Sequence, residues 1–254
     1  MTDELLYEVR DGIGYVTLNR PQARNALTFA MYEGLAAISV ASGDIRALVI
    51  TGAGDKAFAA GTDIAQFRSF NGAEDAIAYE AKLDRVLGAL ERCPVPTIAA
   101  IAGACTGGGA AIAAACDLRI AAANARFGFP IARTLGNCLS MANIARLSAL
   151  IGPARVTEMI FTARLLDAEE ARSVGLVSEV LPDPAALAVR AEALARQVAA
   201  NAPLTLQATK EALRRLRDTL PPDEDLIRLC YTSADFREGM EAFLSKRPPV
   251  WRGA

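Results

Sequence analysis

Residues 107–109 are three consecutive glycines between a strand-like apolar run at residues 97–101 and an alanine-rich stretch of helical character. A strand, a glycine-rich turn and a helix together direct unpaired backbone N–H groups and the positive end of the helix toward one point. Glycine allows a ligand to approach because it has no side chain and accepts positive φ angles. The same pattern also fits a tight connection that uses small residues only for packing, so the glycines need a partner elsewhere in the chain.

A second loop of small residues, 57–64, supplies that partner. It also follows a buried strand, and its sequence AFAAGTDI has few side chains that could block the backbone. If the two loops converge, one N–H group from each can hold a carbonyl oxygen while that oxygen gains negative charge. The two loops therefore predict an oxyanion hole; a plain turn is the alternative for residues 57–64.

The chain of 254 residues contains no histidine, which limits the acid–base chemistry open to it. Ser-His-Asp and Cys-His nucleophilic catalysis are excluded, and so are the commonest transition-metal ligand sets. The five cysteines are scattered without a CxxC pair, so neither a metal site nor a disulfide framework is expected. Proton transfer must come from Asp, Glu, Lys, Tyr or Cys, or from the substrate itself.

Composition favours a cytoplasmic oligomer. The hydrophobic fraction of 52% and the mean hydropathy of +0.23 are high for a monomer and indicate surface buried between subunits. The net charge of −2 argues against nucleic acid as the main partner. No apolar run is long enough to cross a bilayer without interruption, and the acidic start MTDELLYEVRDG lacks the features of a signal peptide.

The apolar periodicity predicts which elements position the two loops. Strands are predicted at residues 5–10, 14–19, 44–51, 97–101, 117–122, 125–127 and 176–180. Helices are predicted between most of these strands, residues 130–136 are predicted to be irregular, and only helices are predicted after residue 183. The apolar stripes of these last helices, such as Leu206, Thr209, Leu213 and Leu216, favour a subunit interface.

Five blocks of the sequence occur in one order and cover nearly the whole chain. They are VTLNRPQARNAL, LVITGAGDKAFAAGTDI, PVPTIAAIAGACTGGGAAIAAACDLRIAAANARFGFP, IGPARVTEMIFTARLLDAEEARSVGLVSEVLP and EGMEAFLSKRPP. Together they resemble the enoyl-CoA hydratase/isomerase, or crotonase, superfamily. The resemblance implies an α/β fold, with a spiral of ββα repeats and the acyl-CoA pocket in residues 1–182. It also implies a C-terminal α-helical oligomerisation region in residues 183–254, and a homotrimer or a hexamer built as a dimer of trimers.

The resemblance assigns binding roles by position. The backbone N–H groups of Thr62 and Gly108 would hold the carbonyl of an acyl-CoA thioester, so coenzyme A would enter as part of the substrate and no cofactor is implied. Positions that would bind the coenzyme A portion are Arg24, Ala60, Asp63, Ile64, Ala65, Phe243 and Lys246. Phe243 and Lys246 match a pair that reaches the nucleotide from a neighbouring subunit; a solvated helix end is the alternative. Asp63 is expected to cap the helix that follows it.

Two carboxylates of the family pattern are missing. Ala111 and Ile131 stand where family hydratases carry their catalytic Glu residues, and no Asp or Glu occurs between Asp117 and Glu158. Residues 131–140 are also one residue longer than the usual family spacing. Hydration by two carboxylates, one activating water and the other supplying a proton, therefore cannot be assigned.

Several side chains are candidates to replace the missing pair. Asn137 or Thr134 could position water or a substrate carbonyl, Arg133 could pair with a substrate carboxylate, and Cys138 could act as an acid or base. A packing or capping role fits each of them at least as well. Ser140 belongs to the same cluster, and Cys105 and Thr106 lie at the mouth of the glycine triplet. Glu80 and Tyr79, on a polar helix over the acyl pocket, are weaker candidates.

Three functions are compatible with this sequence. The first is an enzyme of acyl-CoA enolate chemistry, nominally an enoyl-CoA hydratase or a double-bond isomerase, and the two retained loops favour it. The second is a protein that binds acyl-CoA without turnover, favoured by Ala111 and Ile131. The third is an assembly role with a vestigial pocket, which Arg24 and Lys246 count against. We rank them in this order; the sequence does not identify the acyl group.

Overall fold

The first two strands form a β-hairpin, as predicted. The computed structural model describes residues 3–42, 45–217 and 224–252. Strand β1 (Leu5–Arg10) pairs antiparallel with β2 (Ile13–Leu18). The two turn residues, Asp11 and Gly12, have φ angles of 52° and 72°, which is the backbone that a two-residue hairpin turn requires.

The hairpin is the edge of a six-stranded sheet in the order β1-β2-β3-β5-β7-β10. The remaining strands of this sheet are β3 (Ala47–Gly52), β5 (Thr97–Ile101), β7 (Leu118–Ala122) and β10 (Glu179–Leu181). From β2 onward every neighbour is parallel. Parallel strands buried on both faces read as continuous apolar runs, which explains why β3 and β5 were predictable from sequence.

A second, four-stranded sheet has the order β4-β6-β8-β9. Its strands are β4 (Ala57–Ala59), β6 (Ala104–Thr106), β8 (Arg126–Gly128) and β9 (Leu166–Asp167). The first three are parallel, and each follows directly on a strand of the large sheet. This alternation of one strand in each sheet followed by a helix is the predicted ββα repeat.

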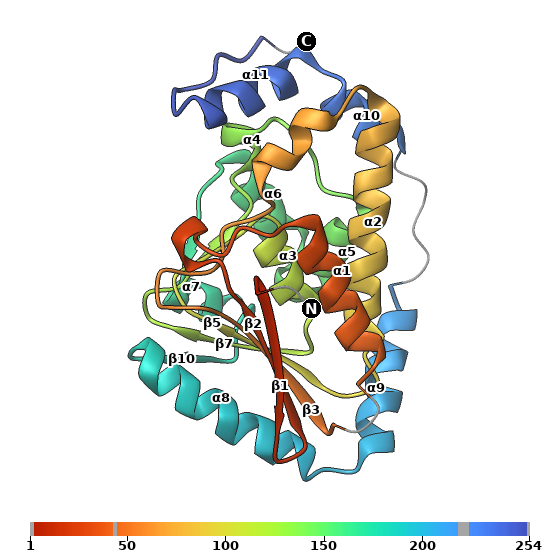
Figure 1. Cartoon of the computed structure of the whole chain (residues 1–254), viewed down its shortest axis with the longest axis vertical. Helices are drawn as coiled ribbons and strands as arrows, with labels where there is room; N and C mark the ends of the chain where they lie inside the picture. The colour runs from red at the N-terminus through yellow and green to blue at the C-terminus, as the bar shows by residue number, and fades with distance from the viewer. Residues whose placement is uncertain (1–2, 43–44, 218–223, 253–254) are drawn as a thin grey trace.

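Helices cover both faces of the large sheet (Figure 1). The helices before residue 183 are α1 (Phe29–Val40), α2 (Ala73–Glu91), α3 (Gly108–Ala115), α4 (Ile131–Thr134), α5 (Met141–Ile151), α6 (Pro153–Phe161) and α7 (Ala168–Ser173), with 3-10 turns η1 (Pro21–Ala23) and η2 (Ile64–Ser69). On the other face, α8 (Pro184–Ala199) buries Leu187, Ala191 and Leu194 against Val49 and Ile98. That apolar face of α8 was predicted from its spacing.

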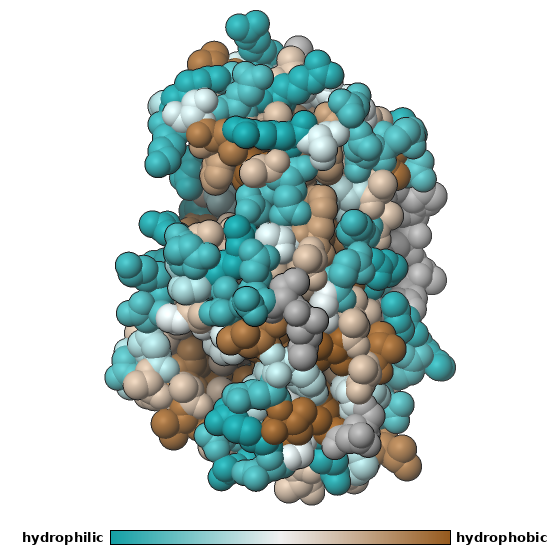
Figure 2. Space-filling view, viewed as in Figure 1, coloured by the Kyte–Doolittle hydropathy of each residue, from teal (hydrophilic) through white to brown (hydrophobic). Residues whose placement is uncertain are grey.

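The remaining helices are α9 (Pro203–Arg215), α10 (Glu224–Tyr231) and α11 (Ala234–Leu244). Helix α10 packs on α2, and α11 packs on η2 and α4, at the top of the molecule in Figure 1. Of the predicted apolar stripe, Leu206 is half-buried, whereas Leu213 and the C-cap residue Leu216 are 60% and 81% accessible. Figure 2 shows other apolar surface toward the lower half of the face in view.

Two predictions of local structure were wrong. Residues 130–136, predicted to be irregular, contain α4, whose single turn is closed by the Thr134 N–H donating to the Pro130 carbonyl at 3.1 Å. The Thr134 hydroxyl donates to the same carbonyl at 2.9 Å. One turn is too short to show an apolar period. The last strand begins at Glu179 rather than at 176, because the N–H groups of Leu176 and Val177 donate to the Ala171 carbonyl and close the turn after α7. Of the strand predicted at 44–51, residue 44 lies outside the described residues.

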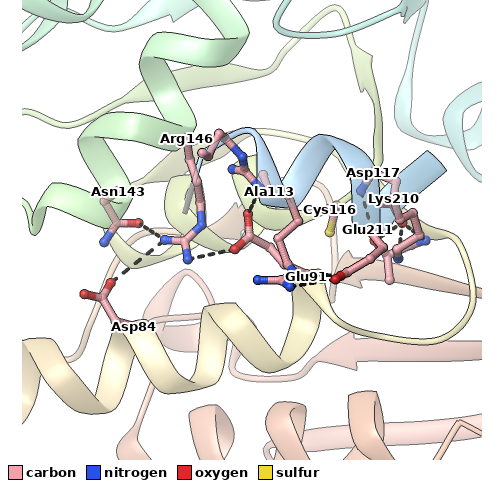
Figure 3. Close-up of polar contacts among 12 residues, drawn as sticks. Asp84, Glu91, Ala113, Cys116, Asp117, Asn143, Arg146, Lys210 and Glu211 are labelled. Atoms are coloured by element: carbon pink, nitrogen blue, oxygen red, sulfur yellow. Dashed lines mark hydrogen bonds and ion pairs between the residues drawn. The ribbon is translucent and has the colours of Figure 1, made fainter. Parts of the chain in front are cut away.

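A buried ion-pair network joins α2, α5 and the segment after α9. The Arg146 guanidinium lies between Glu91 and Asp84, at 2.9 and 3.9 Å (Figure 3). Glu91 also accepts from Arg217 at 2.6 Å. Burial alone would raise the pKa of Glu91, but the hydrogen bonds and charges of the two arginines outweigh burial and lower that pKa.

Replacing Glu91 with Gln should therefore destabilise the fold by about 3 kcal/mol at pH 7, because it leaves buried guanidinium groups short of their carboxylate. The folded-state pKa of Glu91 is lowered, so the ionised group contributes stability above its unfolded pKa of about 4.3 and loses it as pH falls through the folded value. Urea unfolding of wild type and variant should thus differ at pH 7 and converge in acid. The exposed pair Glu33–Arg85 supplies the control, since Glu33→Gln should cost about 0.5 kcal/mol or less. A difference that persisted unchanged in acid would contradict this account.

Candidate functional site

The two small-residue loops converge, as predicted. The loop predicted at 57–64 begins with strand β4, so only residues 60–63 form the turn, and the glycines 107–109 follow strand β6. The two strands are parallel, and their carboxyl ends meet at one edge of the small sheet. A methyl group placed on Gly61 would lie 3.9 Å from the Gly108 nitrogen, and one placed on Gly107 would lie 3.4 Å from the Gly61 Cα. Gly61 and Gly107 have φ angles of 100° and 51°, a region that side chains disfavour. Both glycines are therefore needed for the approach.

The N–H group of Thr62 makes no hydrogen bond to another described residue, and it points away from the neighbouring segment at Leu27. The Gly61 carbonyl accepts from the Leu27 N–H at 2.8 Å, and the Asp63 N–H donates to the Leu27 carbonyl at 2.9 Å. In a trans peptide the N–H points opposite to the carbonyl. The Thr62 N–H, which shares a peptide with the Gly61 carbonyl, must therefore point away from Leu27.

The N–H group of Gly108 is the first of helix α3 and has no intrahelical partner. The Gly107 carbonyl accepts the first helical bond, from the Ala111 N–H at 2.9 Å, so the Gly108 N–H points out of the helix start. It makes no hydrogen bond to another described residue. Thr62 and Gly108 both line the same cavity, and one oxygen placed there can accept from both.

Three hydroxyl groups support this edge of the cavity. The Thr62 hydroxyl lies 2.8 Å from the hydroxyl of Tyr32 and 2.8 Å from that of Tyr79. Both tyrosines are buried, and burial raises the pKa of each above its ordinary value of 10.0. They therefore remain neutral hydroxyl groups that fix the Thr62 side chain.

The cavity has a volume of about 490 Å³ and is largely apolar. Its walls include Phe67, Leu83, Phe129, Leu139 and Phe243. Ala111 and Ile131 line it too, so the two positions that lack the family carboxylates do face the site. Among the described lining residues, the only carboxylates are those of Asp63 and Glu80.

Asp63 has the structural role that was expected. Its side chain accepts from the Ala65 N–H at 3.2 Å and caps η2. It also pairs with Arg20 at 3.0 Å. These contacts occupy the carboxylate in holding the loop that carries Thr62.

The structure brings most of the predicted binding residues to one cavity. The lining contains Arg24, Ala60, Thr62, Asp63, Ile64, Gly108 and Phe243, together with Thr134 and Asn137 of the replacement candidates. Arg24 is positioned by its carbonyl, which accepts from the Ala60 N–H at 3.0 Å. Phe243 lines the cavity of its own chain because α11 folds over η2, and it is also 52% exposed.

Other predicted residues lie outside the described lining. Ala65 is exposed on η2, Arg133 is exposed on α4, and Lys246 is exposed beyond the end of α11. Cys138 hydrogen-bonds the Cys230 thiol, a contact that lowers the pKa of Cys230 to about 7. The hydroxyl of Ser140 caps α5 by accepting from the Asn143 N–H at 3.3 Å.

Hydrogen bonds at the cavity wall join helix α10 to helix α2. The Tyr231 hydroxyl, on α10, donates to Oε1 of Glu80, and it accepts from Nδ2 of Asn137 at 3.2 Å. Tyr32 and Tyr231 were not predicted as site residues. Each sits in an ordinary amphipathic helix pattern, and no local spacing distinguishes either from a core residue.

Comparison with known proteins places this geometry in context. A model of the Enoyl-CoA hydratase/isomerase family matches residues 8–254. The chain is 33% identical over 253 residues to a short-chain-enoyl-CoA hydratase of Clostridium acetobutylicum, and the match covers 96% of each. A crystal structure of an enoyl-CoA hydratase/carnithine racemase from Magnetospirillum magneticum aligns with a TM-score of 0.81 and 36% identity, over 100% of this chain and 97% of that one.

A methylmalonyl-CoA decarboxylase in complex with 2-nitronate-propionyl-CoA aligns with a TM-score of 0.90 and 28% identity, over 99% of both chains.

The packing of α3 against β4 gives a test of how the site is built. A Cβ on Gly109 would lie 2.3 Å from the Ala59 carbonyl oxygen. Alanine has the higher helix propensity by about 1 kcal/mol, yet we expect Gly109→Ala to destabilise the protein by about 2 kcal/mol net. Gly72→Ala is the matched control, because it precedes α2, meets nothing within 4 Å and has an extended φ of 172°. Urea unfolding should show a change within about 0.5 kcal/mol for the control. A stabilising Gly109→Ala would refute the close approach.

Proposed function

The chain belongs to the enoyl-CoA hydratase/isomerase family, and from this premise we propose that its cavity binds an acyl-CoA thioester and stabilises the enolate of that thioester. The observation that carries the proposal is the pair of outward N–H groups of Thr62 and Gly108 at one end of an apolar cavity. Each donor that is preorganised for a developing oxyanion contributes about 3 kcal/mol.

Ordinary enoyl-CoA hydration is the nominal reaction of this family, but the pocket supports it poorly. Hydration needs one group to activate water and another to protonate Cα. An alanine methyl and an isoleucine side chain occupy the positions where family hydratases carry these groups, and neither can transfer a proton. We infer that the enzyme runs a reaction that needs the enolate but not two carboxylates, such as the proton transfer of a double-bond isomerase.

Decarboxylation of a carboxyacyl-CoA is a second candidate. Loss of CO₂ leaves the same thioester enolate without prior removal of a Cα proton, so it needs the two N–H donors and no carboxylate base. The likeness to a methylmalonyl-CoA decarboxylase with 2-nitronate-propionyl-CoA bound favours it. A screen of alkenoyl-CoA and carboxyacyl-CoA thioesters, followed by mass spectrometry, separates the two candidates by product mass. Binding without conversion of any thioester would instead support a binding protein.

We further propose that the enzyme works as a homotrimer or as a dimer of trimers. The exposed apolar side chains of α9, including Leu213 and Leu216, support a subunit interface there. Lys246 is exposed beyond the end of α11, and we propose that it meets the coenzyme A bound by a neighbouring subunit. No helix of the described residues has the length and apolar character needed to cross a membrane.

Butyryl-CoA should bind this protein, whereas free butyrate should bind poorly because it lacks the nucleotide and pantetheine. Phe243→Ala removes apolar surface at the cavity wall and should weaken butyryl-CoA binding about tenfold, or about 1.4 kcal/mol. Phe161→Ala is the control, since Phe161 is 82% exposed and is not among the described lining residues. Titration calorimetry measures both variants. Absence of any saturable heat with acyl-CoA thioesters would remove the proposed function.

Hydration of crotonyl-CoA should be slow or undetectable even where binding is firm. A general acid or base contributes a rate factor of about 10²–10⁴, and this pocket lacks both of the usual groups. The double variant Ala111→Glu with Ile131→Glu should raise the hydration rate, although incompletely, because catalytic geometry tolerates little displacement. Loss of the enoyl absorbance follows the reaction. Turnover of crotonyl-CoA by the unmodified chain at a rate ordinary for enzymes would overturn this interpretation.

A further inference from the structure

We propose that Glu80 is the catalytic base of this pocket, and that Tyr231 of α10 positions it. The inference rests on the proposed function, since it assigns the proton transfer that accompanies enolate formation. The proposed base lies on helix α2, whereas family hydratases carry their catalytic Glu residues at the positions that are Ala111 and Ile131 in this chain.

The position of Glu80 is unusual for a glutamate. Its residue is only 3% exposed, and it lines the cavity that Thr62 and Gly108 also line. The other carboxylate of the described lining, Asp63, is occupied by Arg20 and the cap of η2. A buried carboxylate is costly to desolvate, so its retention in an apolar cavity favours a functional role.

The hydrogen bonds of Tyr231 show that its hydroxyl donates to Glu80 rather than accepting from it. Nδ2 of Asn137 can only donate, and it donates to the Tyr231 oxygen at 3.2 Å. The Tyr231 hydroxyl in turn donates to Oε1 of Glu80. This order, from amide to hydroxyl to carboxylate, presents Glu80 as an acceptor.

Aromatic rings pack against Tyr231, whose hydroxyl contacts this carboxylate. The Tyr231 ring lies 4.8 Å from Phe236 and 6.4 Å from Tyr79, and the Tyr79 ring lies 4.9 Å from Phe67. In such an environment the charge of a carboxylate is felt at longer range than in water. Glu80 is also close enough to raise the pKa of Tyr79 and Tyr32, the two tyrosines whose hydroxyls hold Thr62, although burial is the larger cause.

The proposed step is a single proton transfer. A carboxylate oxygen of Glu80 takes the Cα proton of the bound thioester, so the C–H bond breaks and an O–H bond forms. The electron pair of the C–H bond becomes the Cα=C1 double bond, and the carbonyl electrons move to oxygen, which the N–H groups of Thr62 and Gly108 hold. Return of a proton from Glu80 to Cα, or to Cγ of an unsaturated chain, completes the cycle without a further reactant.

Exchange of the Cα protons of butyryl-CoA in D₂O measures this step directly. Wild type should incorporate deuterium faster than buffer alone, as followed by the mass of the thioester. Glu80→Gln should lower the exchange rate by about 10²–10³, and Glu80→Asp should retain part of it. The dissociation constant of butyryl-CoA should stay within about twofold for both, because the carboxylate acts on the reacting carbon rather than on the coenzyme A portion.

The positioning role of Tyr231 is tested by measuring both the affinity for butyryl-CoA and the rate of Cα deuterium exchange in a Tyr231 variant. Tyr231→Phe should keep the affinity for butyryl-CoA and lower the exchange rate about tenfold. Glu74→Gln is the matched control for Glu80→Gln, because Glu74 lies on the same helix, α2, is 80% exposed and pairs with Arg228 at the surface. It should exchange as fast as wild type. Unfolding curves measured beside the kinetics identify any variant that fails to fold, and Tyr231→Phe then carries the test in place of Glu80→Gln.

The outcomes are distinct. If wild type binds butyryl-CoA but exchanges no faster than buffer, or if Glu80→Gln exchanges within threefold of wild type, the assignment of Glu80 is wrong and the proposed binding function survives. If no acyl-CoA thioester binds at all, the proposed function itself fails. Loss of exchange in Glu80→Gln with binding retained supports the inference.

Discussion

The whole site depends on backbone segments that approach more closely than side chains permit. A Cβ on Gly103 would lie 2.2 Å from the Lys56 carbonyl oxygen, and one on Gly109 would lie 2.3 Å from that of Ala59. The first approach lets β6 start beside β4, and the second packs α3 on β4, so that the loops after the two strands end at one place. Because Leu27 occupies the inner side of the first loop, the Thr62 N–H can only face outward. The donors are thus set by the backbone and remain when nearby side chains change.

The C-terminal helices, for which we propose a role in assembly, are also part of this site. Helix α10 brings Tyr231 to Glu80, and α11 brings Phe243 to the cavity wall. Lys210 of α9 contacts Asp117 at 2.5 Å, which ties the same region to the start of β7 (Figure 3). The region predicted to serve oligomerisation, residues 183–254, thus also supplies side chains to the pocket.

The glycine pattern, the apolar strands and the cap at Asp63 were predictable because each depends on neighbours in the sequence. The Tyr231–Glu80 contact spans 151 residues, and the Tyr32–Thr62 contact spans 30, so neither leaves a local signal. Glu80 was a weak candidate because its helix is polar and its burial is set by α10. Arg133 and Cys138 lie close in sequence to residues of the site. However, Arg133 is exposed on α4, and Cys138 hydrogen-bonds the Cys230 thiol.

The central claim is that two backbone N–H groups polarise a thioester carbonyl in this cavity. An infrared difference spectrum of butyryl-CoA labelled with ¹³C at the carbonyl, bound to the protein, tests it most directly. Two donors fixed toward the oxygen weaken the C=O bond more than mobile water does. The account predicts a carbonyl band at lower frequency in the complex than in buffer. A band at the buffer frequency or above it, with binding confirmed in the same sample, would contradict the account.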